Sequence, residues 1–208
     1  MQGRQKLVFD KLITSSGIVT VSFFAAITFL YLYAPVKVNP IVIPASLPMV
    51  VDDVTTPKPV INVPTTLKIK NINVEASINP VGVTPVGNMD IDENPKQLAW
   101  YKFGPKPGEK GSAVIAGHYG WKDTIPSVFN DLNRLAKGDT ITTYDAAGNE
   151  LIFVVVRTEL YAPDQDATKV FRSDDGNAHL NLITCQGSWN NSSRTYSERL
   201  VVFTDLVK

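Results

Sequence analysis

The stretch HLNLITCQGSW, residues 179–189, decides how this sequence folds and where its chemistry lies. It begins with a mostly apolar run that is typical of a buried β-strand, and the run ends at the only cysteine of the chain, Cys185. A polar loop then leads to a final apolar run, RLVVFTDLV at residues 199–207, which opens with Arg199. If the two runs pair antiparallel, the loop returns Arg199 to the side of Cys185. The sequence therefore predicts a strand pair with a thiol and a guanidinium at one end.

Short β-type runs with little helix account for most of the chain from Thr65 onward. Residues 145–149, DAAGN, are typical of a hairpin turn between two of these runs. The segment 126–135 is a helix candidate, since its apolar residues fall on one helical face, and 168–171 is a second short one. Many short strands predict a mainly β domain, either a closed barrel or a sandwich. The expected strands lie at residues 66–83 (two runs with a turn near Asn71), 112–118, 139–145, 150–160, 179–185 and 199–207.

The amino-acid composition of the chain limits the classes of molecule that it is expected to bind. The 208 residues include 20 basic and 20 acidic side chains, so no net charge favours nucleic acid or an anionic surface, and no nucleic-acid partner is expected. The two histidines, His118 and His179, are far apart in the sequence, and with a single cysteine they do not form a zinc motif. We therefore expect neither a metal site nor a cofactor.

The N-terminus carries an apolar segment, Leu12 to Ala34, without a charged residue. As a helix it would span about 35 Å, enough to cross a hydrocarbon core of about 30 Å. Basic residues are concentrated before it, so the positive-inside rule places residues 1–11 in the cytoplasm and exports the rest. We predict a single-pass protein of the cell membrane with an extracellular C-terminal domain.

A cleaved signal peptide is the alternative for the same segment. Signal peptides have an apolar region of about 7–15 residues followed by a cleavage site of the A-x-A type. The apolar segment here is longer, and its end, Tyr33-Ala34-Pro35, is a poor cleavage site, so we favour an uncleaved anchor at 12–34. Seven prolines in residues 35–64 predict a semi-extended stalk, followed by a folded domain at 65–208.

Cys185 has two interpretations. A lone cysteine in an exported domain has no disulfide partner within the chain, and free cysteine is among the most buried residue types, which favours a packing role. A catalytic thiolate, by contrast, needs a base or a cation close by. The choice therefore depends on which residues can lie beside it.

Four residues are candidates to lie beside Cys185, two histidines and two arginines. His118 ends the apolar run 112–118, as expected for a residue at a barrel rim, whereas His179 begins the strand whose other end carries Cys185. Six residues of extended chain span about 20 Å, so His179 is interpreted as structural. Arg199 and Arg194 both follow the thiol, and either can supply a cation, although Arg199 opens a strand and Arg194 lies in the polar loop.

The motifs SAVIAGHYG and LITCQGSW…SERLVVF together resemble the sortases, the cysteine transpeptidases of Gram-positive cell surfaces. That family has a histidine closing a strand in an AGH context, a TLxTC strand and an arginine opening the last strand. The resemblance covers residues 65–208 and implies a closed β-barrel of about eight strands with one or two short helices, preceded by a transmembrane helix. LAWYKFGPKPGEKGSAVIAGH and APDQDATKVF look more like the class F or class E branches than class A.

The resemblance implies a function and a site. Cys185 becomes the nucleophile, His118 the general acid and base, and Arg199 the residue that stabilises the oxyanion, while Thr184 matches a family threonine expected to contact substrate. Such an enzyme, a hydrolase of the cysteine peptidase class, cleaves an LPxTG-like sorting signal through a thioacyl intermediate. It then transfers the acyl chain to an amine on a peptidoglycan precursor or another surface protein. Asn181 departs from the pattern, which begins with threonine at that position.

Several alternatives stay open beside it. The main one is a non-catalytic, membrane-tethered extracellular β-domain with a structural buried cysteine. Other cysteine enzymes fit less well, because the SHGC pattern of L,D-transpeptidases is absent and NlpC/P60-type hydrolases place cysteine before histidine. Acidic residues between Asp164 and Asp175 could bind calcium, but an ordinary solvated loop is the simpler interpretation.

Overall fold

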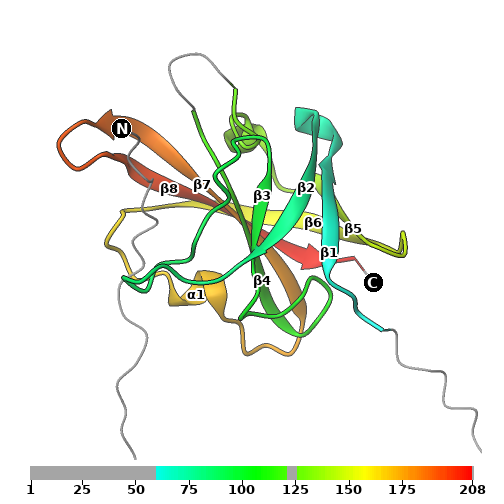
Figure 1. Cartoon of the computed structure of the whole chain (residues 1–208). Helices are drawn as coiled ribbons and strands as arrows, with labels where there is room; N and C mark the ends of the chain where they lie inside the picture. Colours follow the sequence, from blue (N-terminus) through cyan, green and yellow to red (C-terminus); the bar gives the residue numbers. More distant parts are fainter. Residues whose placement is uncertain (1–59, 121–125, 208) are drawn as a thin grey trace, which may run out of the picture. The chain divides into compact units, whose positions relative to one another are not determined.

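The computed structural model describes residues 60–120 and 126–207, which form a closed β-barrel (Figure 1). The strand order around the barrel is β1-β2-β3-β4-β7-β8-β6-β5, and pairing of β1 with β5 closes it. The eight strands are β1 (Pro64–Ile69), β2 (Val74–Val81), β3 (Leu98–Tyr101), β4 (Gly111–Gly117), β5 (Thr140–Asp145), β6 (Glu150–Tyr161), β7 (Ala178–Asn190) and β8 (Thr195–Leu206). The helical elements are short: α1 (Thr168–Phe171) and the 3₁₀ turns η1 (Lys70–Ile72) and η3 (Leu132–Arg134).

The mainly β architecture predicted from the sequence is confirmed, and closure distinguishes a barrel from a sandwich. The hairpin turn at 145–149 is also confirmed, with the Asp145 carboxylate accepting hydrogen bonds from the backbone of Ala147 and Asn149. The short strand β3 was not predicted. It pairs parallel to β2 and antiparallel to β4, so it depends on neighbours that are distant in sequence.

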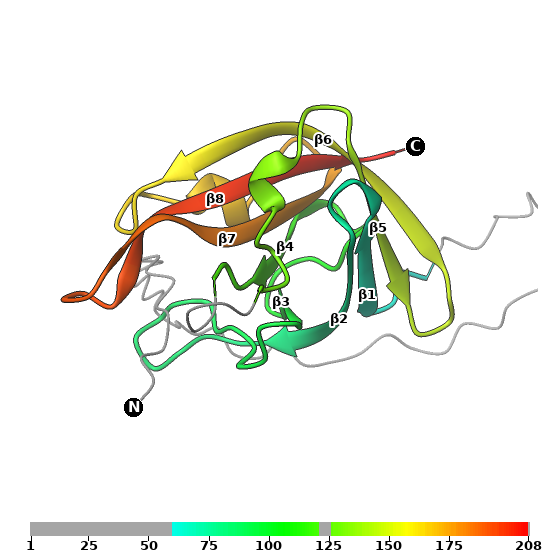
Figure 2. The ribbon, with the colours of Figure 1, turned by 90° about the horizontal axis from the view of Figure 1, so that it is seen from above.

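Strands β4, β7 and β8 form the part of the barrel that positions the predicted site residues. β4 and β7 run parallel, with Ala116 opposite Ile183 as the last aligned pair. β7 and β8 are antiparallel, with Cys185 opposite Arg199, as the sequence predicted. β7 and β8 continue beyond the barrel as a two-stranded ribbon (Figures 1 and 2).

That ribbon differs from the polar loop expected at residues 186–198. The strands stay paired out to Asn190 and Thr195, across an irregularity between Gln186 and Trp189. Trp189 and Tyr196 face each other with ring centroids 5.2 Å apart, and such cross-strand aromatic pairs stabilise a hairpin. Aromatic pairing across the ribbon therefore extends the sheet into a region whose composition suggested a loop.

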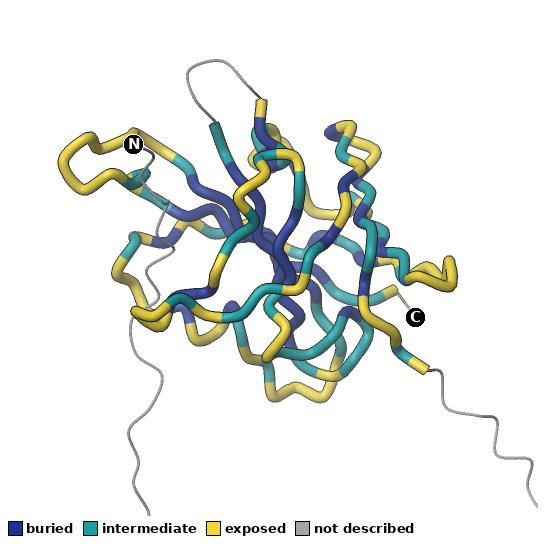
Figure 3. The backbone as a smooth tube through the Cα atoms, in the orientation of Figure 1, coloured by how far each residue is buried: buried dark blue, intermediate teal, exposed yellow. Residues whose placement is uncertain are grey.

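Two apolar clusters lie on opposite faces of β4, β7 and β8, because side chains alternate along a strand. The first fills the barrel and includes Ile115, Leu182 and Val202. The second lies on the outer face, where Ala116 and Ile183 are covered by residues of α1 and of the β2–β3 connection. In Figure 3 the buried residues, drawn in dark blue, gather where these strands cross at the centre of the view. A residue on the outer face is therefore buried although it points away from the barrel interior.

The helix expected over residues 126–135 is not formed; only η3 and neighbouring turns are present. The backbone bonds there span three residues, as from Leu132 N–H to the Phe129 carbonyl. The Asn130 side chain competes for backbone donors, because its Oδ1 accepts from the N–H groups of Gly120 and Ser127. Phe129 and Leu132 are fully buried in the first apolar cluster, so the segment closes one end of the barrel.

The predicted anchor at 12–34, the N-terminal residues 1–11 and the stalk up to residue 59 lie outside the described residues. Among the residues that are described, no helix is both long and apolar enough to cross a membrane.

His179 is held between two carboxylates at the start of β7. Its Nδ1 lies 2.8 Å from Asp205 Oδ1 and its Nε2 lies 3.0 Å from Asp175 Oδ1. Burial lowers the pKa of His179, but the hydrogen bonds to Asp175 and Asp205 outweigh it and raise that pKa above its ordinary value. The same contact holds the pKa of Asp175 below its usual range. The geometry supports the structural interpretation of His179, as a clamp between β7, β8 and the loop before β7.

The clamp gives folding stability a defined pH dependence. Because the folded-state pKa of His179 is raised, its contribution is fully present below the unfolded pKa and is lost as pH rises through the folded value. We expect His179→Asn to lower the Tm at pH 6, and the difference from wild type to shrink by pH 9. Thermal denaturation at both pH values measures this. An equal loss of Tm at both would show that the charge of the imidazole contributes nothing.

Candidate active site

The barrel brings Cys185, His118 and Arg199 together although they are distant in sequence. Cys185 and Arg199 are directly opposite across β7 and β8. On the parallel pair, Ala116 lies opposite Ile183, and two residues further along each strand direction come His118 and Cys185. The three residues that the sequence singled out therefore lie at one level across three adjacent strands.

All three side chains belong to the outer face of the sheet. They continue the rows of Ala116, Ile183 and Val201, which form the second apolar cluster. The exposed fractions are 4% for Cys185, 3% for His118 and 1% for Arg199. Three polar groups are thus buried at the edge of an apolar surface, where burial disfavours the charged forms of the thiol and the imidazole.

Two opposing effects determine the pKa of the Cys185 thiol. Burial raises the pKa of the thiol, because a thiolate loses its hydration in that environment, and the positive charge of Arg199 lowers it. Burial is the larger effect, so the thiol carries its proton at neutral pH. The described structure therefore holds a neutral cysteine that needs a base when it reacts.

His118 lies directly after the neighbouring strand β4, and its imidazole can accept a proton. Its Nε2 lies 2.7 Å from the backbone carbonyl of Asp92, and because a carbonyl only accepts, Nε2 carries the hydrogen. Burial lowers the pKa of His118, and the bond to Asp92 partly opposes that shift. The imidazole is therefore neutral near pH 7, with Nδ1 as its acceptor nitrogen.

Arg199 is fixed by the strand that carries it. Its Nη1 donates to the carbonyls of Tyr196 at 3.1 Å and Glu198 at 2.9 Å, and its Nη2 donates to Thr195 Oγ1 at 2.7 Å. Arg194 lies in the exposed turn of the ribbon with a positive φ of 53°. The two arginines left open by the sequence thus differ in position, and Arg199 is the one in register with the thiol.

Thr184 and Asn181 brace the strand that carries the thiol. Thr184 Oγ1 donates to the Gly117 carbonyl at 2.8 Å, which ties β7 to the end of β4 next to His118. The hydroxyl is buried, and a contact of Thr184 with substrate stays a prediction. Asn181 Nδ2 donates to the Val170 carbonyl at 2.6 Å and so holds α1 against β7.

An aromatic group beside the thiol was missed by the sequence reasoning. Tyr119 follows His118, and its ring packs edge-on to Tyr196, with centroids 5.3 Å apart. Burial, and then the neighbouring Cys185 and Tyr119, raise the pKa of the Tyr196 phenol. With Trp189, which is 41% exposed, these rings form one side of the site. The aromatic residues in the expected loop, Trp189 and Tyr196, were the available signal.

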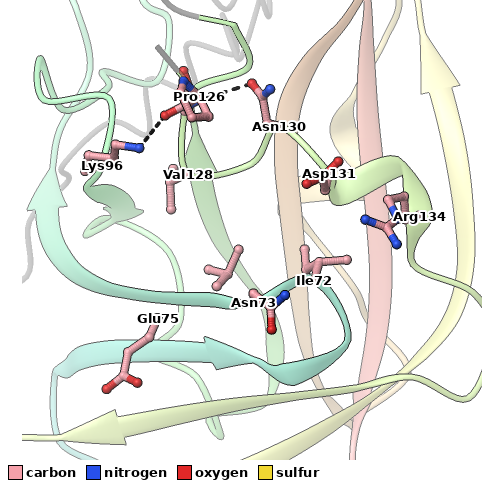
Figure 4. Close-up of a pocket in the computed structure, with 11 residues that line it drawn as sticks. Ile72, Asn73, Glu75, Lys96, Pro126, Val128, Asn130, Asp131 and Arg134 are labelled. Carbon is pink, nitrogen blue, oxygen red and sulfur yellow. Dashed lines mark hydrogen bonds between the residues drawn. The ribbon is translucent and has the colours of Figure 1, made fainter.

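A cavity of about 380 Å³ lies at the barrel end near η1 (Figure 4). Lys96 crosses its rim and donates to the Pro126 carbonyl at 2.5 Å. Val128 in its wall packs against the first apolar cluster, and Cys185, His118 and Arg199 are not among the lining residues. This cavity is therefore separate from the predicted site residues.

The acidic residues near α1 make local contacts in the structure. Asp166 accepts hydrogen bonds from Thr168, Asp174 pairs with Arg172, and Asp175 contacts His179. Within residues 60–120 and 126–207, no group of three or more histidine, cysteine, aspartate or glutamate side chains is placed to hold a metal ion.

Comparison with known proteins accounts for this arrangement. The sortase domain model matches residues 67–207, which is more than half of the chain. The chain belongs to the sortase family. Sortases are cysteine transpeptidases, and the family assigned from the sequence motifs is confirmed. No curated protein gave a significant sequence match.

Solved sortase structures share the fold at low sequence identity. A lid mutant of sortase A from Corynebacterium diphtheriae is 23% identical, with a TM-score of 0.55 and coverage of 70% of each chain. Sortase C-1 from Actinomyces oris is 24% identical, with a TM-score of 0.54, covering 69% of this chain and 73% of its own. Streptococcus agalactiae sortase C1, in complex with MTSET, is 23% identical with a TM-score of 0.53, covering 69% and 67% respectively. These matches establish the barrel, whereas the A and C labels belong to those proteins.

The pairing of Cys185 with Arg199 generates a test that needs no substrate. Since the charge of Arg199 lowers the pKa of Cys185, Arg199→Gln should move iodoacetamide alkylation to higher pH. Arg194→Gln, which removes a charge from the exposed turn, is the matched control and should leave the profile unchanged. Mass spectrometry of the alkylated chain across pH gives both profiles, with thermal denaturation as the check on folding. A larger shift in the Arg194 variant would reassign the cation.

Proposed function

We propose that this protein is a membrane-anchored sortase that cleaves an LPxTG-like sorting signal and transfers the acyl chain to an amine. The observation that carries the proposal is the alignment of Cys185 in β7, Arg199 in β8 and His118 directly after β4, all three of them buried. A thiol, a neutral imidazole and a fixed guanidinium are the groups that acyl transfer through a thioester requires.

The first half of the reaction forms the acyl-enzyme. As the sulfur of Cys185 attacks the scissile carbonyl, its proton passes to His118, so thiolate character develops only in contact with the substrate. The carbonyl oxygen gains negative charge, which the guanidinium of Arg199 stabilises. When the carbon–nitrogen bond breaks, the proton on His118 passes to the departing amine, and the acyl group remains on sulfur.

The second half reverses the proton transfers with a new amine. His118, neutral again, removes a proton from the acceptor as its nitrogen attacks the thioester, and the sulfur leaves and recovers a proton. Water in place of the amine gives hydrolysis. The acceptor amine of a peptidoglycan precursor or of another surface protein is the partner that this chemistry favours.

Burial of Cys185 also supports the rival function, a non-catalytic β-domain in which the thiol fills space. The raised pKa of Cys185 fits that role as well as it fits a resting enzyme. The rival assigns no purpose to an arginine of 1% exposure opposite the thiol, since burying a charged side chain costs stability. The two functions differ in whether Cys185 forms a covalent acyl adduct.

That adduct is the decisive measurement. The full chain in detergent, incubated with a library of LPxTG-like peptides, should gain the mass of the acyl fragment, and Cys185→Ala should gain none while keeping its fold. His118→Ala should acylate about 10² to 10⁴ times more slowly, because it lacks the positioned acid and base. His179→Ala is the histidine control and should acylate at nearly the wild-type rate. Peptide cleavage by a well-folded Cys185→Ala variant would refute the thiol mechanism.

We propose further that residues 12–34 anchor the enzyme with residues 1–11 in the cytoplasm and the barrel outside. The support is the length of the uncharged segment and the basic residues that precede it. The full chain expressed in a bacterium should fractionate with membranes, and external protease should degrade the barrel in intact protoplasts. A chain replaced at 12–34 by a polar linker should leave the membrane fraction. Protection of the barrel from external protease would contradict the orientation.

A further inference from the structure

The connection between β2 and β3, residues 82–97, contacts the site through a backbone group. Met89 in this connection is buried in the outer apolar cluster, and a bridge from Val83 to Met89 folds the connection back on itself. Three residues later, the Asp92 carbonyl accepts the hydrogen of His118 Nε2 at 2.7 Å. The connection therefore determines which way the imidazole is turned.

Asp92 is itself held on both sides of its carboxylate. Its Oδ1 accepts the backbone N–H of Asn94 at 2.8 Å, and its Oδ2 accepts from Asn79 Nδ2 at 2.6 Å. Asn79 Nδ2 also donates to Gln97 Oε1 at 2.7 Å. Since Asn79 lies within β2, opposite Ala99 of β3, the chain of contacts begins on a strand of the barrel. One side-chain hydrogen bond, from Asn79 to Asp92, therefore connects a strand of the barrel to the residue whose carbonyl His118 faces, and the bonds from Asn94 to Asp92 and from Asn79 to Gln97 brace it.

We infer that Asn79 and Asp92 are positioning residues for the general acid and base. They hold His118 with its Nε2–H on the Asp92 carbonyl, so that Nδ1 is the atom that exchanges protons with Cys185 and with the substrate amine. This inference rests on the proposed function and assigns the proton-transfer atom within it.

The proton balance is consistent with a fixed Nε2–H. In acylation the thiol proton moves from sulfur to Nδ1, which makes the ring an imidazolium, and then moves from Nδ1 to the departing nitrogen. The hydrogen on Nε2 stays in place throughout, and its bond to the Asp92 carbonyl strengthens while the ring is charged. That bond therefore opposes the burial that disfavours the charged ring.

The Asp92 carbonyl must stay in place because the two nitrogens of the His118 ring can exchange their roles. A neutral imidazole has one hydrogen for two nitrogens, and the partner of one nitrogen determines the role of the other. If the Asp92 carbonyl shifts, the ring can take the other tautomer and present a donor to the thiol where an acceptor is needed. The other ionisable groups around the site are Cys185 on β7, Tyr196, Glu198 and Arg199 on β8, Tyr119 beside His118, and Asp92 and Glu93 in the connection.

The test compares two asparagines with the same chemistry. Asn79→Ala removes the donor to Asp92, whereas Asn149→Ala removes an equivalent donor, Nδ2 to Asp145 Oδ2 at 2.8 Å, at the β5–β6 hairpin. In each full-length chain, nitrogen-edited NMR of the imidazole reports the tautomer and the pKa of His118. Single-turnover acylation with the reactive sorting peptide reports the rate across pH.

Wild type and Asn149→Ala should show the Nε2–H tautomer, while Asn79→Ala should show a mixture of both. The pKa of His118 should fall in Asn79→Ala, because the lost carbonyl contact raises it in the wild type. Acylation should slow about tenfold to a hundredfold with little change in KM, as expected for a misplaced catalytic group. Asp92→Asn keeps one side-chain acceptor and the backbone carbonyl, so its acylation rate should fall less than that of Asn79→Ala.

Identical His118 spectra in Asn79→Ala and Asn149→Ala overturn the inference, as does slower acylation without a change of tautomer or pKa. A wild-type chain that forms no acyl adduct would refute the proposed enzyme instead. The NMR comparison of the two variants would still decide whether Asn79 and Asp92 orient the ring.

Discussion

The parallel pairing of β4 with β7 is the constraint on which the rest of the site depends. It places Ala116 opposite Ile183, so His118, directly after β4, and Cys185, within β7, follow at the same level. A shift by one residue would turn one of the two side chains into the barrel interior. The bond from Thr184 to the Gly117 carbonyl joins the two strands at this level, and Gly117 has no room for a side chain against Phe129. The β4–β7 register is thus fixed within one residue of both His118 and Cys185.

Burial affects the protonation of the Cys185 thiol and the His118 imidazole. A buried thiol and a buried imidazole both favour their neutral forms, and the structure shows both shifts. A neutral pair avoids the cost of desolvating two separate charges in the resting protein. The charge of Arg199 remains, held by two carbonyls and a hydroxyl of its own strand. The resting site therefore holds one buried charge, that of Arg199, beside a neutral thiol and a neutral imidazole.

The site combines rigid and peripheral parts. Cys185 and Arg199 are held by strand pairing, and His118 follows directly after β4, but the outer cluster that surrounds them includes α1 and the β2–β3 connection. Asn181 fastens α1 to β7, and Asn79 fastens the connection to β2. Each peripheral segment thus packs on the outer apolar cluster and is also tied to the barrel by the side chain of an asparagine.

The sequence by itself determined the β class and the strand pair that places Cys185 beside Arg199, and it predicted His118 as the partner histidine. Apolar alternation and turn composition are local patterns that a few neighbouring residues reveal. The three motifs occur along this chain in the same order as in the sortase family. Only the tertiary structure decided that 126–135 closes the barrel without a helix, that Trp189 and Tyr196 extend the sheet, and that Asn79 and Asp92 hold the imidazole. These features depend on contacts between segments distant in sequence, or on a backbone carbonyl, which every residue has and no residue type reveals.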